Sequence, residues 1–204
     1  MKSISSSKVV ALTTPLAALA VSNVNAAYDA FLKIEGPDVK GESRVEGHED
    51  SIEILSFSWG VSNPGAIGTI GGGSGGGKVS VSDFKITKRT DKASPQLFRS
   101  AVVAEHWVGD EDHAPIRLVM VYSPEDSDES VEVFSIELDN SIISELRGEV
   151  VPAARGDDGD RPTESLSLSF GKIKMNFSDQ DDGGNYLGLE PDRAISVDNP
   201  ALED

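Results

Sequence analysis

Residues 78–107 read KVSVSDFKITKRTDKASPQLFRSAVVAEHW, and this stretch decides the fold. Its first part, residues 78–88, is rich in β-branched and aromatic side chains, which suit the pleated surface of a sheet and predict a strand. Residues 89–93, RTDKA, then predict a turn. Helical spacing of apolar residues begins directly after this turn, so the stretch places a helix beside a sheet.

The helix is predicted over about residues 94–106. Ser94 stands where a side-chain oxygen accepts hydrogen bonds from the unpaired N–H groups of a helix start, and Pro95 suits the first helical position because it has no N–H. We find no other capped amphipathic helix after residue 26, so we expect one helix on a mostly β body. The apolar spacing predicts the stripe that packs on this body, made of Leu97, Phe98, Ala101 and Val102.

Composition excludes several classes of function. The chain has 204 residues, no cysteine and a net charge of −17. The absence of cysteine excludes a disulfide framework, thiolate metal sites and a cysteine nucleophile. The acidic surplus argues against nucleic acid as a partner, because phosphates would be repelled. It fits a protein that assembles through specific contacts.

Residues 1–26 have the layout of a secretory signal peptide. Lys2 and Lys8 precede the apolar run 9–21, and small residues follow up to Ala26. We predict cleavage after Ala26 and a secreted or periplasmic location, because the apolar run is too short to anchor the chain across a bilayer. No other segment could cross a membrane, so we predict no membrane insertion after cleavage. Residues 1–26 contain two lysines and no acidic residue, so the chain without them has a net charge of −19. Its length suits one domain.

Alternating apolar residues predict the remaining strands, and turn-forming residues separate them. The acidic residues 180–204 contain few core-forming side chains and predict a largely disordered tail. The predicted strands are 27–35, a short polar strand within 41–50, and then 51–61, 116–122, 131–140, 142–151 and 164–179.

Three of these strands change the phase of their alternation. The changes fall between Ile54 and Leu55, between Val133 and Phe134, and across Gly171-Lys172. A phase change indicates a bulge or burial on both faces, and at Gly171 we expect a glycine bulge in a bent strand. Strands of this kind are typical of a barrel or a strongly coiled sheet.

Residues 63–77, NPGAIGTIGGGSGGG, are rich in glycine. Their end has the spacing of a phosphate-binding loop, but Val79 replaces the Ser or Thr that would bind a metal, and a strand follows in place of a helix. We therefore predict a flexible surface loop and no nucleotide site. The apolar residues Ala66, Ile67 and Ile70 favour ordering of this loop against a partner.

The sequence offers little for catalysis. Its three histidines are His48, His106 and His113, and no nucleophile-elbow motif lies between a strand and a helix. We predict no catalytic residue and no cofactor. His106 and His113 flank the acidic residues 110–112, which we interpret as a solvated loop because the spacing matches no metal-ligand pattern.

One acidic segment approximates a calcium-binding loop. Asp179, Asp181 and Glu190 stand at its positions one, three and twelve, and Gly184 stands at position six. Gly183 replaces the acid or amide of position five, and a strand in place of a helix precedes the segment. We predict no metal site and keep these three acidic residues as candidates for a low-affinity calcium site.

Four segments resemble one known family. They are AYDAFLKIEGPDVKGES at 27–43, EDSIEILSFSWGVSNP at 49–64, VSDFKITKRTDKASPQLFRS at 81–100 and ESLSLSFGKIKMNFSD at 164–179. In order and spacing they are similar to the haemolysin-coregulated protein (Hcp) family, the tube subunit of the bacterial type VI secretion system. The most specific part is FKITKRTDKASPQLF.

The resemblance implies a mainly β fold over residues 27–179, a β-barrel of two packed sheets with one flanking helix. It implies a structural protein without enzymatic activity, which forms homo-hexameric rings. Stacked rings would form a hollow tube that carries effector proteins and meets other secretion-system components. By the same resemblance residues 61–78 reach a neighbouring ring, with the candidate contact residues Ala66, Ile67, Ile70, Gly72, Ser74 and Gly77.

Two alternatives remain open at this point. A tube subunit that assembles in the cytoplasm needs no signal peptide, so residues 1–26 support an exported protein that forms rings or filaments without an injection machine. A secreted hydrolase is the third hypothesis, and it requires a turnover that depends on His106 or His113.

Overall fold

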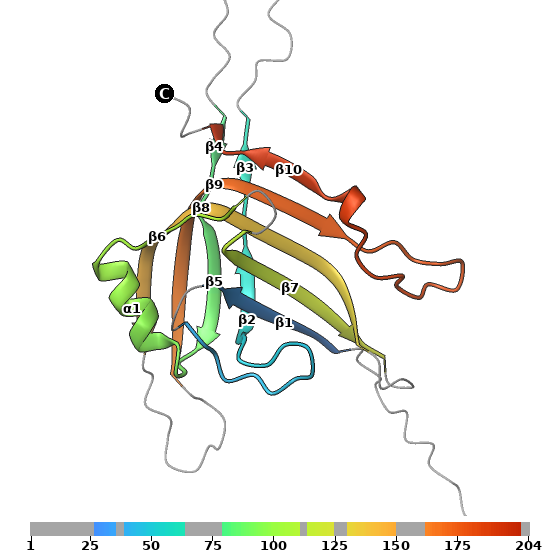
Figure 1. Cartoon of the computed structure of the whole chain (residues 1–204), viewed down its shortest axis with the longest axis horizontal. Coiled ribbons are helices and arrows are strands. Elements are labelled where there is room, and N and C mark those ends of the chain that lie inside the picture. Colours follow the sequence, from blue (N-terminus) through green and yellow to red (C-terminus); the bar gives the residue numbers. More distant parts are fainter. Residues whose placement is uncertain are drawn as a thin grey trace, which may run out of the picture.

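The computed structural model describes residues 27–35, 39–63, 79–110, 114–124, 130–149 and 162–200. Figure 1 shows strands that wrap into a barrel, with one α-helix at its side. The predicted mainly β fold, a barrel with one flanking helix, is confirmed.

The barrel is a closed ladder of antiparallel strands. Its order is β5, β2, β1, β7, β8 and β9, and β9 then pairs with β5. Closure removes the free edges that would otherwise pair with other chains at random. The bounds are β1 Ala27–Ile34, β2 Ile52–Ser58, β5 Phe84–Arg89, β7 Ile116–Ser123, β8 Val131–Glu149 and β9 Thr163–Phe177.

The other described elements lie outside this closed ladder. The helix α1, Ser94–Val102, contacts β8, and the short strand β6, His106–Trp107, also pairs with β8. Strands β3, Val61–Ser62, and β4, Ser80–Val81, form a separate two-stranded sheet. The 3₁₀ turn η1, Pro191–Arg193, leads into β10, Ile195–Asp198, which pairs with β9.

Apolar side chains from all strands of the barrel meet in one core. Burying one such side chain contributes roughly 1.5–3 kcal/mol, so this core is the main favourable term in folding. A second, smaller cluster of Phe31, Val119 and Val121 lies on the opposite side of β1 and β7, as the alternation of a strand requires. The fully buried members of the main core include Leu32, Ile52, Phe84, Ile86, Leu97, Ile116, Leu118, Ile136, Leu138 and Leu166.

Two of the predicted phase changes are bulges. The pairing of β2 with β5 shifts between Ile54 and Ser56. The pairing of β7 with β8 shifts where Met120 lies opposite Phe134 and Val121 lies opposite Glu132, which leaves Val133 as the extra residue. A bulge bends and twists its strand, and these bends help the sheet to close.

The predicted bulge at Gly171 is wrong. The pairing of β8 with β9 keeps its register across this residue and shifts only between Ile143 and Glu145. Gly171 is needed for another reason, because a Cβ atom there would lie 2.5 Å from Asn140 Nδ2. Asn140 itself has a φ of 53°, so β8 bends sharply at this point while it remains one strand. The segments 131–140 and 142–151, predicted as two strands, therefore join within β8.

Two further predictions need correction. Residues 41–50 form no strand; they form a loop that folds back on itself just before β2, with Gly41 N–H donating to Asp50 O and Ser43 N–H donating to Ser51 O. Residues 180–200 are not disordered. In this part of the tail, β10 pairs with β9, and the buried Asn199 forms hydrogen bonds with the backbone of β9. The predicted strand 78–88 is also divided, into β4 and β5, with a break at residues 82–83.

Candidate assembly surfaces

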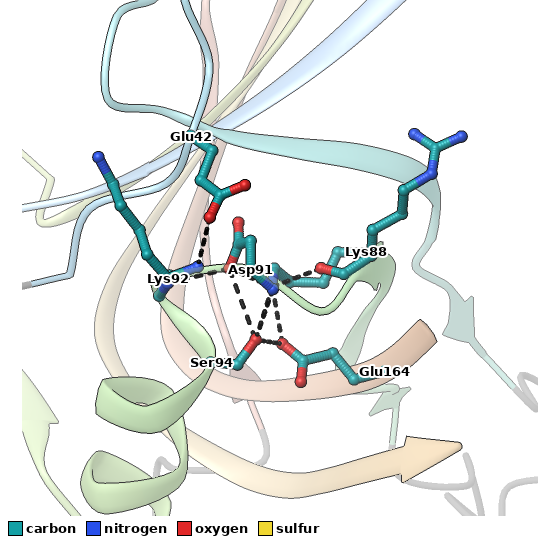
Figure 2. A network of polar contacts seen from close by, with 8 residues as sticks. Glu42, Lys88, Asp91, Lys92, Ser94 and Glu164 are labelled. Atoms are coloured by element: carbon teal, nitrogen blue, oxygen red, sulfur yellow. Dashed lines mark hydrogen bonds and ion pairs between the residues drawn. The ribbon is translucent and has the colours of Figure 1, made fainter. Parts of the chain in front are cut away.

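A buried polar network lies at the centre of the stretch that decides the fold (Figure 2). The Lys88 side chain is fully buried, and its Nζ lies 2.7 Å from Asp91 Oδ1 and 2.7 Å from Glu164 Oε1. The same ammonium group donates to Ser94 Oγ at 3.2 Å and to the Arg89 carbonyl at 2.8 Å. A buried charge needs such compensation, because unpaired it would carry a desolvation penalty of several kcal/mol.

Ser94 belongs to this network and does not cap the helix. Its Oγ donates to Glu164 Oε1 at 2.7 Å and accepts from Asp91 N–H at 3.0 Å. The N-cap residue is Ala93, whose N–H donates to Asp91 Oδ1 at 3.0 Å, and Pro95 follows within the first turn. The predicted N-cap is therefore wrong by one residue, and the Asp91 carboxylate binds the turn that precedes the helix.

The helix α1 follows directly from this network and turns one side to the barrel. Leu97 and Ser100 are buried, whereas Phe98 is 63% exposed and Val102 is 69% exposed. The predicted apolar stripe is thus wrong for Phe98 and Val102, and Ala101 is half-buried. An exposed phenylalanine and valine four residues apart form an apolar ridge on the outer face of the helix.

The helix ends earlier than predicted, at Val102. Ala104 has a φ of 49°, a left-handed conformation in which the helix cannot continue. Glu105 N–H then donates to Ser100 O. Residues 106–107 form β6 instead of the last helical turn. The exposed Val103 lies next to the ridge, so the outer apolar face of α1 consists of Phe98, Val102 and Val103.

The loop 39–51 is tied to the start of the helix. Lys92 Nζ lies 2.9 Å from Asp50 Oδ1, and Lys40 Nζ lies 3.1 Å from Asp50 Oδ2. Hydrogen bonds from Lys92 and Lys40 lower the pKa of Asp50 below its ordinary value. Lys92 N–H also donates to Glu42 Oε1 at 3.1 Å.

Two short paired strands, β3 and β4, flank the glycine-rich segment in the sequence. Val61 pairs with Val81 and Ser62 pairs with Ser80, and Ser82 N–H donates to Gly60 O at 2.9 Å. The candidate ring contacts predicted from the sequence lie outside the described residues, namely Ala66, Ile67, Ile70, Gly72, Ser74 and Gly77.

Aromatic rings extend from the base of these paired strands across the barrel. Trp59 is exposed, and its ring lies 5.7 Å from the ring of Phe134. Phe134 lies 6.3 Å from Phe177, which lies 6.3 Å from Tyr186. Tyr186 shares a 2.9 Å hydrogen bond between hydroxyl groups with Tyr28, and this bond raises the pKa of Tyr28. Exposed aromatic rings of this kind are enriched where proteins bind one another.

A groove of about 440 Å³ opens beside these rings, between the end of β9 and β10. Most of its lining is apolar, and Phe177, Ile195 and Val197 are more than half exposed. No sequence pattern predicts this groove, because the strand β10 that builds one wall lies in the tail that composition predicts to be disordered. We call this feature the β9–β10 groove; its lining is Phe134, Ile173, Met175, Asn176, Phe177, Asp179, Arg193, Ile195 and Val197.

The structure separates the histidines considered for chemistry. The His48 ring stacks on Phe31 at 4.7 Å, and His106 Nε2 lies 2.5 Å from Asn140 Oδ1. His113 and the acidic residues 111–112 lie outside the described residues. Nothing in the described part of the chain gathers three or more metal-ligating side chains.

The calcium candidates have other partners. Asp179 and Glu190 both form ion pairs with Arg193. Asp181 accepts hydrogen bonds from the amide of Asn185 and from the N–H of Gly183, and these bonds, led by those from Asn185, lower its pKa. Arg193 therefore supplies a positive charge beside two of the three candidate carboxylates.

One ion pair predicts a dependence of stability on pH. Arg117 donates to Glu132 at 3.1 and 2.6 Å. Burial alone raises the pKa of Glu132, but the hydrogen bonds and charge of Arg117, with a contribution from His48, hold it below the ordinary value. A lowered folded-state pKa stabilises the protein above the unfolded value, about 4.3, and the effect is lost as pH falls through the folded value.

We therefore expect Glu132→Gln to lower the free energy of unfolding at neutral pH by more than it does at low pH. The measurement is urea unfolding of both proteins between about pH 3 and 7, across the ordinary glutamate range. A difference that stays constant over this range would contradict the assigned role of the Arg117–Glu132 pair.

No helix within the described residues is both long and apolar enough to cross a membrane.

Comparison with known proteins gives a consistent result. Residues 31–177 match the family model described as type VI secretion system effector, Hcp. The chain is 31% identical over 155 residues to the protein hcp1 of Pseudomonas aeruginosa, which covers 76% of this chain and 85% of that relative.

Solved structures share the fold. Hcp1 from Salmonella typhimurium superposes with a TM-score of 0.57 at 23% identity, covering 86% of this chain and 96% of the other. A type VI secretion system effector from Yersinia pestis superposes with a TM-score of 0.56 at 24% identity, covering 83% and 99% of the two chains.

Proposed function

The chain belongs to the Hcp family of type VI secretion proteins, and on that premise we propose that it is a structural subunit whose rings build a tube. The family is a structural component of the secretion system and not an enzyme family. In this proposal six copies close into a ring, rings stack, and the tube carries effector proteins in its lumen. The observation that carries it is the family match over residues 31–177, which begins within β1 and includes the other five strands of the closed barrel and the flanking helix.

The surface of the barrel supports an assembling protein. The outer face of α1, the ring of Trp59 and the β9–β10 groove all expose large apolar side chains. A protein with a net charge of −17 is well solvated elsewhere, so these patches stand out as places for contact with protein. The buried Lys88 network supports the proposal by holding α1 in one orientation, which a repeated contact requires.

A second candidate function rests on residues 1–26. Their signal-peptide layout favours an exported protein of the periplasm or cell exterior that forms rings or filaments without an injection machine. The two functions share the ring and differ in the machine. Genes for sheath and baseplate components beside this gene would favour the tube, and their absence would favour the exported assembly.

The glycine-rich segment is proposed to join rings. The paired strands β3 and β4 lie on either side of this segment in the sequence, and three apolar residues, Ala66, Ile67 and Ile70, lie within it. We expect deletion of residues 68–77 to leave single rings intact and to abolish stacking into tubes. Negative-stain microscopy of the purified chain from Ala27 onward, with and without the deletion, is the measurement.

The microscopy also tests the ring itself. Rings or tubes from the undeleted chain are the expected result. Tubes of unchanged length from the deleted chain would contradict the stacking role of the segment, and an undeleted chain that forms neither rings nor tubes would contradict the proposed function.

A further inference from the structure

We propose that the outer apolar face of α1 in one copy of the chain binds the β9–β10 groove of the next copy. This inference rests on the proposed ring and names the two surfaces that close it. Figure 1 shows α1 on one side of the barrel and the η1 end of β10 on the other. Two different surfaces on opposite sides form a heterologous contact, which generates a closed ring when the rotation between copies allows it.

Both surfaces expose large apolar side chains. Phe98 and Val102 are 63% and 69% exposed, and their spacing of four residues makes a ridge. The β9–β10 groove is lined mainly by apolar side chains, and its volume of about 440 Å³ lies in the range, roughly 300–1,000 Å³, of pockets that bind small ligands. An amphipathic helix that lays its apolar ridge in such a groove is a recurring mode of recognition.

Charge favours a second copy as the occupant. The charged residues of the groove lining, Asp179 and Arg193, form an ion pair with each other, so the lining itself carries no net charge. The helix α1 contains Arg99 and no acidic residue, although the whole chain carries a net charge of −17. Two copies of so acidic a chain repel each other except where such patches meet, and Arg99 is attracted to the acidic partner.

The groove is also built to be rigid. Val197 pairs with Ile173 and Ile195 pairs with Met175 in the β9–β10 ladder. The buried Asn199 fixes the chain after β10 to β9. Its backbone N–H donates to Gly171 O at 2.7 Å, and its side-chain amide donates to Phe170 O at 2.8 Å. A preformed groove lowers the entropic cost of binding, which helps a contact made by a short helix.

The first test uses two charge substitutions and their mixture. Phe98→Glu removes the ridge and leaves the groove, whereas Val197→Glu blocks the groove and leaves the ridge. Both side chains are exposed, so the barrel should fold in either variant, as circular dichroism can verify. We expect each variant alone to have the mass of a single chain, and an equimolar mixture to form one-to-one dimers, because one intact pair of surfaces remains.

The control is Val45→Glu, an equal change of charge at an exposed apolar residue that belongs to neither surface. It should assemble as the unchanged protein does. If the unchanged protein forms rings and either Phe98→Glu or Val197→Glu still forms them, the inference is wrong and the proposed function stands. Two monomeric variants that give no mixed dimer would also overturn it. If the unchanged protein is a monomer, both the proposed function and the proposed contact are wrong.

A covalent test does not depend on disrupting assembly. The chain has no cysteine, so Phe98→Cys and Val197→Cys each introduce one thiol. Mixed and oxidised, the two variants should give a disulfide-linked dimer that neither gives alone under the same conditions. Absence of this dimer, in a mixture that microscopy shows to be assembled into rings, would overturn the inference.

Discussion

Replacing Lys88 by methionine is expected to lower the free energy of unfolding by roughly 3–5 kcal/mol, the cost of removing one partner from a buried ion pair. The loss of the ammonium group would leave the carboxylates of Asp91 and Glu164, both nearly buried, without their positive partner. Equilibrium unfolding in urea measures the change. Because the network joins β5, the start of α1 and β9, we also expect α1 to lose its fixed position.

Lys92→Met is the matched control. Lys92 lies four residues further along the chain and pairs with Asp50, but about half of its side chain is exposed. Solvent and salt screen such a pair, so the variant should unfold at nearly the same urea concentration as the unchanged protein. Equal destabilisation by the two substitutions would show that burial of the network is not what makes Lys88 important.

Gly41→Ala should produce the second large effect, a loss of roughly 3 kcal/mol, the upper end of the usual cost of overpacking. A Cβ atom at this position would collide with the carbonyl of Ser51 and lie 2.5 Å from Ile52 Cα. These are backbone atoms at the start of β2, and Ile52 belongs to the core, so they cannot move aside cheaply. Thermal or urea unfolding provides the measurement.

Gly148→Ala separates steric collision from the general effect of replacing glycine. Gly148 lies in β8, and a Cβ atom there would meet nothing within 4 Å. Alanine reduces the freedom of the unfolded chain, so this variant should be neutral or more stable by up to about 1 kcal/mol. A Gly41→Ala protein as stable as Gly148→Ala would refute the close approach of the loop 39–51 to β2.

Local signals predicted much of the fold. The stretch 78–107 marks a strand, a turn and a helix because β-branched residues, turn residues and helical spacing follow one another within a short segment. The phase change at Val133 marked a real bulge, because an extra residue shifts every later side chain to the other face. Such features depend on near neighbours in the sequence.

Contacts between distant residues account for the errors. Ser94 was expected to cap the helix, but its hydroxyl binds Glu164, which is 70 residues away in the sequence. Phe98 is exposed and Ser100 is buried, so the spacing of apolar residues alone could not identify the buried face of α1. The acidic composition of the tail predicts disorder, but Asn199 binds the backbone of β9 at Phe170, 29 residues away in the sequence.

The candidate assembly surfaces were predictable only in part. The glycine-rich segment was identified by composition, and its apolar residues remain candidates for a ring contact. The β9–β10 groove exists only because β10 pairs with β9, and no short-range pattern in the sequence predicts that pairing.

The most direct test of the central claim is the mass of the assembled protein in solution. Mass photometry of the chain from Ala27 onward should give particles of six chain masses, with larger multiples where rings stack. A single-chain mass at every protein concentration, salt concentration and calcium concentration would contradict the account, because the barrel would then exist without the ring that it is proposed to build.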